Sequence, residues 1–152
     1  MASYQVQRTI TIKADPAVVY ERIVNLHQWE SWSPWEGIDP AMTKSYAGPD
    51  SGVGSSYAWK GNRKVGEGKM VITDTEEPSR VTLDLEFLKP FKSRSETVFR
   101  LDPREGSTEV TWSMTGDHNF LSRVMSVFVS MDKMVGKDFE KGLAQLKGDV
   151  ES

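Results

Sequence analysis

Few side chains in this sequence have the chemistry and position of a functional group, and Arg8 and Asp132 stand out among them. Strand-like alternation puts Arg8 on the same side as Val6, Ile10 and Ile12. It therefore either extends to solvent or reaches a buried acid. Asp132 falls roughly 40° from the centre of an apolar helical stripe. Either it reaches water at the helix edge, or it meets Arg8 and the two anchor one end of a hollow.

Hydroxyl side chains form a second group of candidates. Between residues 92 and 101 the charged side chains alternate with Ser95, Thr97 and Phe99. The charged face must point outward, so the inner face is partly hydroxylic, as in a pocket that has a few polar groups. His27 and His118 fall at the boundaries of expected elements, where surface or capping roles are usual. We therefore predict no catalytic residue, and an enzymatic role stays open as the less favoured alternative.

Composition excludes several classes of site. The 152 residues contain 22 acidic and 19 basic side chains, and no basic block that would suit nucleic acid. There is no cysteine, and the two histidines lack ligand-like spacing, so neither a metal nor a cofactor is expected. No run approaches the ~20 apolar residues of a membrane span. These features predict a cytoplasmic protein without membrane insertion.

The element that must position these groups is a long helix from about Phe120 to Lys147. Its apolar stripe is broad in the first half and narrow after Val135. The second half is expected to clamp onto a sheet, with Gly136 and Gly142 permitting close approach. The first half faces something extra, which is more protein, a partner or a small molecule.

The rest of the chain is predicted to be mostly strands. A first strand is followed by a short helix, which begins at Asp15-Pro16 and ends near residues 25–28. The segment with Trp29, Trp32 and Trp35 is expected to be a turn and a loop, either a core plug or a pocket rim, with Trp35 the better rim candidate. Six antiparallel strands joined by short turns follow.

A meander of six twisted strands must curl around something to bury its apolar face, and the long helix is large enough. The fold class is therefore predicted to be α+β: a curved antiparallel sheet of about seven strands wrapped around a long C-terminal helix, with one or two short helices after the first strand. The chain is expected to form one domain, 1–152. The hollow between helix and sheet would be surrounded by Trp59, Phe87, Phe99, Trp112, Met125, Phe128 and Met131.

Several motifs resemble those of a known superfamily. They are Trp32-Ser33-Pro34-Trp35, Asp39-Pro40, residues 57–62, Gly66-Glu67-Gly68 and residues 131–143. Together they resemble the START-like, or SRPBCC, superfamily (Bet v 1-like helix-grip), and within it the bacterial polyketide cyclase/dehydrase-like branch. The resemblance implies a helix-grip fold with a cavity between sheet and C-terminal helix, which in many relatives holds lipids, sterols or aromatic polyketides.

The expected function is to bind or carry a small hydrophobic ligand, such as a lipid, a sterol or an aromatic polyketide-like molecule. One alternative is a polyketide cyclase/dehydratase-type enzyme that acts by templating in the cavity. Another is a co-chaperone-like interaction module, and the chain is expected to be a monomer or a homodimer. The predicted ligand-binding residues are Trp35, Trp59, Met70, Phe87, Ser95, Thr97, Phe99, Trp112, Met125, Phe128, Met131, Asp132 and Arg8.

Overall fold

The computed structural model describes the backbone of residues 3–34, 41–61, 66–89, 93–117 and 125–151. The chain begins with strand β1 (Ser3–Ile12), helix α1 (Pro16–Val24) and the 3-10 helix η1 (Leu26–Ser31). Six more strands follow, and helix α3 (Met125–Glu151) comes last. These strands are β2 (Thr43–Ala47), β3 (Ser56–Lys60), β4 (Glu67–Glu76), β5 (Arg80–Lys89), β6 (Ser93–Arg104) and β7 (Ser107–Asp117).

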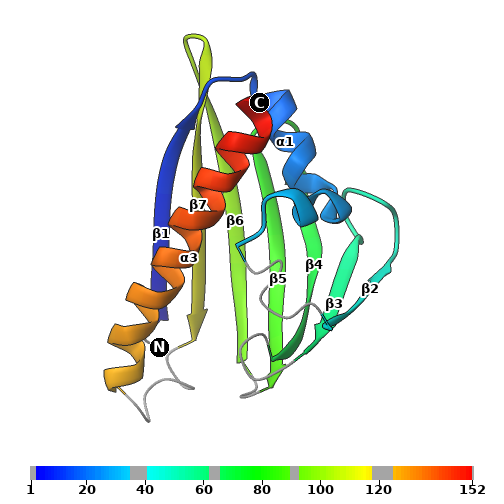
Figure 1. The fold of residues 1–152 in the computed structure, drawn as a ribbon, viewed down its shortest axis with the longest axis vertical. Coiled ribbons are helices and arrows are strands. Elements are labelled where there is room, and N and C mark those ends of the chain that lie inside the picture. The colour runs from blue at the N-terminus through cyan, green and yellow to red at the C-terminus, as the bar shows by residue number, and fades with distance from the viewer. Residues whose placement is uncertain (1–2, 35–40, 62–65, 90–92, 118–124, 152) are drawn as a thin grey trace.

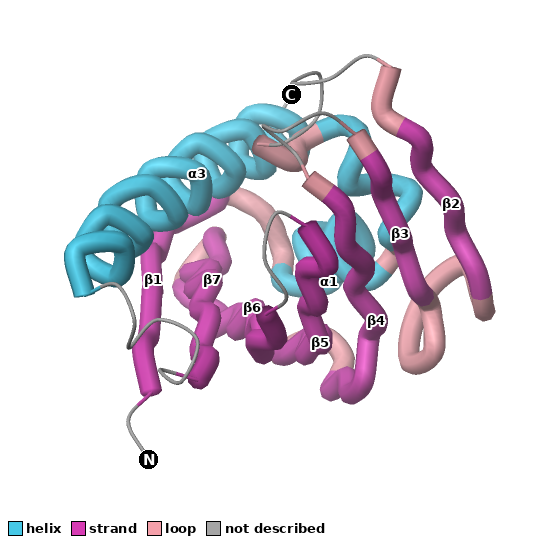
Figure 2. The backbone as a smooth tube through the Cα atoms, turned by 90° about the horizontal axis from the view of Figure 1, so that it is seen from below, coloured by secondary structure: helices cyan, strands magenta, loops and turns pink. Residues whose placement is uncertain are grey.

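All seven strands form one antiparallel sheet in the order β1-β7-β6-β5-β4-β3-β2. The six strands from β2 to β7 therefore make a meander, and β1 joins it beside β7 (Figure 1). Figure 2 shows the sheet curving beneath α3, which runs over β1 while β2 and β3 lie at the far side. This α+β arrangement of a curved sheet and a long C-terminal helix confirms the predicted fold class.

Cross-strand register fixes which side chains share the inner face of the sheet. Trp112 on β7 lies opposite both Arg8 and Phe99, and Phe99 lies opposite Val81. Residues directly opposite in an antiparallel pair point to the same side, so these four share the face that α3 covers. The alternation predicted for β6 is confirmed: Arg94, Glu96 and Arg100 are exposed, and Ser95, Thr97 and Phe99 are buried.

The two short helices close one end of the sheet. Pro16 opens α1, where its missing N–H removes no helical hydrogen bond, and Val19 and Ile23 face the core. Helix α1 ends at Val24, and the side chain of the next residue, Asn25, accepts a hydrogen bond from the His27 amide at the start of η1. Trp29 therefore lies in a 3-10 helix, which is the second of the one or two short helices predicted after the first strand, and not in a turn or loop.

Helix α3 extends to Glu151, beyond the end predicted at Lys147. Its second half is a clamp as expected, since Phe139, Leu143 and Leu146 are buried against the sheet and the short helices. A Cβ on Gly142 would lie 2.8 Å from both Pro34 Cδ and Trp112 Cζ3, which confirms the predicted close approach. The side chains of residues 125–135 lie outside the described part of the structure.

Candidate ligand-binding site

An aromatic cluster fills the end of the inner face beneath the second half of α3. It consists of Trp29, Trp32, Phe99, Trp112 and Phe139, all nearly or fully buried. Trp112 stacks on Phe139 with ring centroids 4.1 Å apart, and the Trp29 and Trp32 indoles donate hydrogen bonds to the backbone carbonyls of Ile23 and Arg22. Trp29 and Trp32 therefore act as the core plug, one of the two predicted roles.

Phe99 and Trp112 were predicted to border the cavity, and the structure places both inside this cluster with 0% and 1% exposure. Protein covers both rings on all sides, so these residues are part of the core beside the candidate site. Trp35, the preferred rim candidate, lies outside the described residues.

The other end of the inner face is apolar but less completely covered. Register brings together five side chains that we call the inner-face patch: Tyr57, Trp59, Met70, Leu85 and Phe87. Tyr57 lies opposite Met70, which lies opposite Leu85. Tyr57 is 9% exposed, and the other four are half-buried. Large apolar side chains left half-buried on the concave side of a sheet are typical of a ligand site.

Gly68 shapes the floor of this patch. It lies between Trp59 and Phe87 on the neighbouring strands, and these two rings meet edge to face across it with centroids 5.5 Å apart. A Cβ at this position would lie 2.6 Å from the Glu86 carbonyl oxygen and 2.8 Å from the Trp59 ring. The indole of Trp59 therefore occupies the space beside Gly68.

Ser95 and Thr97 bring hydroxyl groups to the same face. Ser95 lies opposite Leu85 of the patch, and Thr97 lies opposite Leu83 and Met114. They are 8% and 6% exposed, respectively. The polar side chains in direct register with the patch are therefore Ser95, opposite Leu85, and on β2 Lys44, opposite Trp59, and Tyr46, opposite Tyr57.

Arg8 is on the inner face, as its parity predicted, but at the edge strand. Its Nε donates to Glu140 Oε2 of α3 at 2.9 Å, and its Nη1 donates to the Gln7 carbonyl at 2.7 Å. The Arg8 and Glu140 side chains are 31% and 60% exposed, so the pair contributes at most about 1 kcal/mol to stability. The Asp132 side chain lies outside the described residues, and its pairing with Arg8 stays a prediction.

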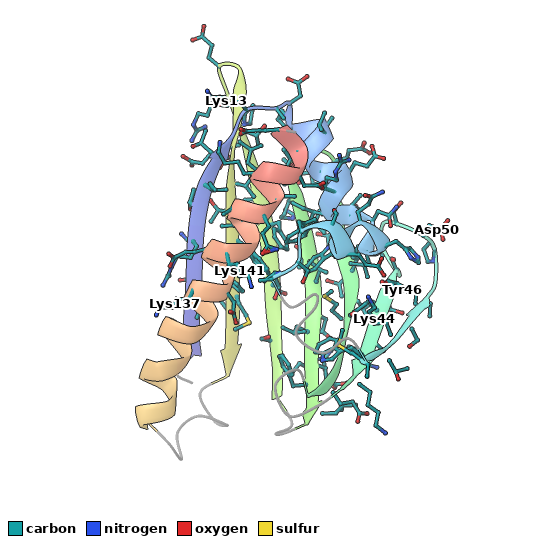
Figure 3. The ribbon with its side chains drawn as sticks, in the orientation of Figure 1. Lys13, Lys44, Tyr46, Asp50, Lys137 and Lys141 are labelled. Carbon is teal, nitrogen blue, oxygen red and sulfur yellow. The ribbon has the colours of Figure 1, made fainter. Side chains whose placement is uncertain are left out.

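A polar cluster lies between η1 and the edge strand β2. Glu30 Oε1 accepts from Lys44 Nζ at 3.1 Å and from the Tyr46 hydroxyl at 3.4 Å, and the His27 ring stacks on Tyr46. Figure 3 shows Lys44 and Tyr46 on the opposite side of the molecule from Lys137 and Lys141 of α3. Sequence reasoning missed this cluster and the inclusion of Tyr57 and Leu85 in the patch, since both depend on strand register.

Three of the predicted ligand residues, Met125, Phe128 and Met131, share with Asp132 a stretch of α3 whose side chains are not described. Among the residues that the structure describes, no group of three His, Cys, Asp or Glu side chains could hold a metal ion. In that same part of the chain, no helix is both long and apolar enough to cross a bilayer.

Residues 3–151 match the family model described as "Polyketide cyclase / dehydrase and lipid transport". The chain belongs to this family. The match takes in every described strand and helix, and it confirms the resemblance drawn from the sequence motifs. No curated protein matches the chain at a significant level.

Several solved structures have folds similar to that of this chain. A protein from Chromobacterium violaceum has a TM-score of 0.71 and 13% identity, with 97% of each chain covered. A protein from Nitrosospira multiformis has a TM-score of 0.65 and 21% identity, over 97% of this chain and 96% of the other. DynU16, from the dynemicin biosynthetic locus, has a TM-score of 0.69 and 13% identity, over 97% of this chain and 47% of its own. At 13–21% sequence identity, these comparisons show similarity of fold alone.

Proposed function

We propose that this protein binds and carries a small hydrophobic molecule between the inner face of its sheet and α3. The observation that carries the proposal is the contrast between the two ends of that face. The aromatic cluster is nearly sealed, whereas Trp59, Met70, Leu85 and Phe87 remain half-buried. Covering these side chains with an apolar ligand would remove further apolar surface from water, at about 25 cal/mol per Å².

The position of α3 supports the same proposal. Among the strands, α3 lies closest to β1 and next to β7, whereas the patch is on β3, β4 and β5. The buried side chains of its described half, Phe139, Leu143 and Leu146, belong to the sealed core. A ligand is thus the partner that we assign to the patch.

Native mass spectrometry of the purified protein, followed by tryptophan fluorescence titration, tests this function. We expect an added mass of a few hundred daltons that organic extraction removes. Fatty alcohols, sterols or aromatic polyketides added back should alter the emission of Trp59 and saturate at one molecule per chain. A protein that carries no added mass and responds to none of these classes would contradict the proposal.

A second candidate function is polyketide cyclase/dehydratase-type catalysis, which the description of the family favours. The similar fold of DynU16, a protein of the dynemicin biosynthetic locus, supports the same candidate. The catalytic contribution would be templating, in which the cavity holds a flexible poly-β-keto chain folded for ring closure. Incubation with a short poly-β-ketone analogue tests this candidate. A cyclised product that forms faster with protein than with buffer supports it, and equal rates argue for a carrier.

A further inference from the structure

We propose that the bound molecule carries a carboxylate at one end of an apolar body, and that Lys44 and Tyr46 of β2 bind this carboxylate. The inference rests on the proposed carrier function and specifies the chemical class of the ligand. Lys44 lies opposite Trp59 of the inner-face patch, and Tyr46 lies opposite Tyr57. Side chains directly opposite in an antiparallel pair share one side of the sheet, with Cβ atoms about 5 Å apart. A ligand that covers Trp59 is therefore within reach of Lys44.

These two donors already converge on a carboxylate oxygen. Lys44 Nζ and the Tyr46 hydroxyl both donate to Glu30 Oε1 of η1, at 3.1 Å and 3.4 Å. The His27 ring stacks on Tyr46 with centroids 3.9 Å apart, which helps to hold the phenol in place. One oxyanion can thus accept from an ammonium and a hydroxyl at this point, and charge-assisted hydrogen bonds of this kind are strong. Glu30 marks the position that we assign to the carboxylate of the ligand.

The exposure of Glu30 explains how a ligand can replace it. The Glu30 side chain is 56% exposed and that of Lys44 is 27% exposed, so Lys44 is the more buried partner. An ion pair this open to water contributes little to stability, and Glu30 can therefore turn to solvent when a ligand carboxylate takes its place. The site then presents apolar side chains, two donors and solvent in that order. An amphipathic acid fits this order, with its apolar body on Trp59 and its carboxylate at Lys44.

The test compares dodecanoate with 1-dodecanol, which has the same chain length but no charge, on the purified protein at pH 8, where a carboxylic acid is ionised. Displacement of a neutral fluorescent probe gives each dissociation constant. Lys44→Met should weaken dodecanoate binding roughly five-fold and leave 1-dodecanol binding unchanged, because only the anion uses the ammonium. Glu30→Gln removes the competing carboxylate and should tighten dodecanoate binding roughly three-fold.

Two milder variants and a matched pair of controls complete the set. Lys44→Arg keeps the charge and should retain most of the dodecanoate affinity, whereas Tyr46→Phe removes one donor and should weaken it roughly two-fold. Lys69 and Glu86 form the control pair, with Nζ and Oε1 3.9 Å apart. They lie on β4 and β5, which also carry the patch, but on the opposite face, since Lys69 alternates with Met70. Lys69→Met and Glu86→Gln change the same charges and should alter neither affinity.

The opposite signs of the Lys44→Met and Glu30→Gln effects distinguish a binding site from an ion pair that only joins η1 to β2. Loss of a purely structural pair would act in the same direction in both variants and on both probes. That result, no effect of Lys44→Met on dodecanoate, or equal effects in the control pair would overturn this inference and leave the carrier function standing. Failure of both probes to bind the unsubstituted protein would instead count against the carrier function.

Discussion

Gly68 is a residue whose role can be tested without knowledge of the ligand. A Cβ at this position would press on the Glu86 carbonyl and on the Trp59 ring. Overpacking of this kind typically costs about 1–3 kcal/mol, so Gly68→Ala should lower the free energy of unfolding by that amount in urea titrations. In a Trp59→Leu background the cost should be smaller, since only the carbonyl contact remains. Equal costs in both backgrounds would contradict the role assigned to Trp59.

Gly136 and Arg8 should be coupled. A Cβ on Gly136 would collide with the Arg8 guanidinium, which lies across α3 at this point. Alanine is favoured over glycine inside a helix by about 1 kcal/mol, so Gly136→Ala should be stabilising once Arg8 is replaced by alanine, and neutral or destabilising in its presence. Thermal unfolding of the four proteins in this cycle gives the coupling. Additive effects would show that the Arg8 side chain does not constrain the helix.

A parallel cycle addresses the prediction that Arg8 meets Asp132. Arg8→Gln and Asp132→Asn should be non-additive in the free energy of unfolding if the two side chains interact. A second cycle, Arg8→Gln with Glu140→Gln, serves as the comparison. It removes the Arg8–Glu140 ion pair that the structure shows. Additive losses for the Asp132 pair, beside coupling for the Glu140 pair, would contradict an Arg8–Asp132 anchor.

At the scale of elements, α3 offers two glycines that should behave in opposite ways. A Cβ on Gly142 would meet Pro34 and Trp112, whereas a Cβ on Gly148 would meet nothing within 4 Å. Gly142→Ala should therefore destabilise the protein by about 1–3 kcal/mol, and Gly148→Ala should stabilise it by up to about 1 kcal/mol. Both are measured by chemical denaturation. Stabilisation by Gly142→Ala would show that α3 does not lie so close to the sheet.

The end of α3 is tied to the β1–α1 connection through Glu151. The Lys13 amide and the Lys147 ammonium donate to Glu151 Oε2 at 2.8 Å and 2.6 Å, and these bonds lower the pKa of Glu151. A lowered pKa gives stability that is present above the unfolded-state pKa and lost as pH falls through the folded-state pKa. Glu151→Gln should therefore lower Tm at pH 7, with a difference that vanishes in acid. A difference independent of pH would argue against this linkage.

The elements themselves could be predicted where one face is buried. The alternation of Val81, Leu83 and Leu85 was enough to place β5, because a slip of one residue would turn all three to solvent. A second short helix after the first strand was left open beside a turn, but its 3-10 geometry was not predicted, since Trp29 and Trp32 mark burial and not backbone geometry. The tight turn of η1 follows from its capping by Asn25 and from docking on the core.

The candidate site could be predicted only in part, because it depends on tertiary register. The sequence placed Trp59, Met70, Phe87, Ser95 and Thr97 on inner faces, since strand parity alone decides that. It could not separate Phe99 and Trp112, which the plug seals, from the half-buried residues of the patch. That distinction depends on where α1, η1 and α3 lie along the sheet.

At the scale of the whole molecule, the exposed apolar residues bear on the interaction-module alternative. The large apolar side chains most exposed in the described part of the chain are Val18, Val53 and Leu88, which come from α1, the β2–β3 connection and β5. Docking surfaces usually present a continuous apolar patch.

The mass measured by native mass spectrometry also gives the oligomeric state, and monomer and homodimer both remain predictions.

The location of the ligand is the central claim, and methyl NMR of the protein titrated with 1-dodecanol tests it most directly. The account predicts large shifts for the Met70 and Leu85 methyls in the patch. It predicts little change for Leu146 in the sealed core and for exposed Leu88. Saturation at one molecule per chain, with this pattern, would establish the site. Shifts confined to Leu88 and other exposed methyls, or none at all, would contradict it.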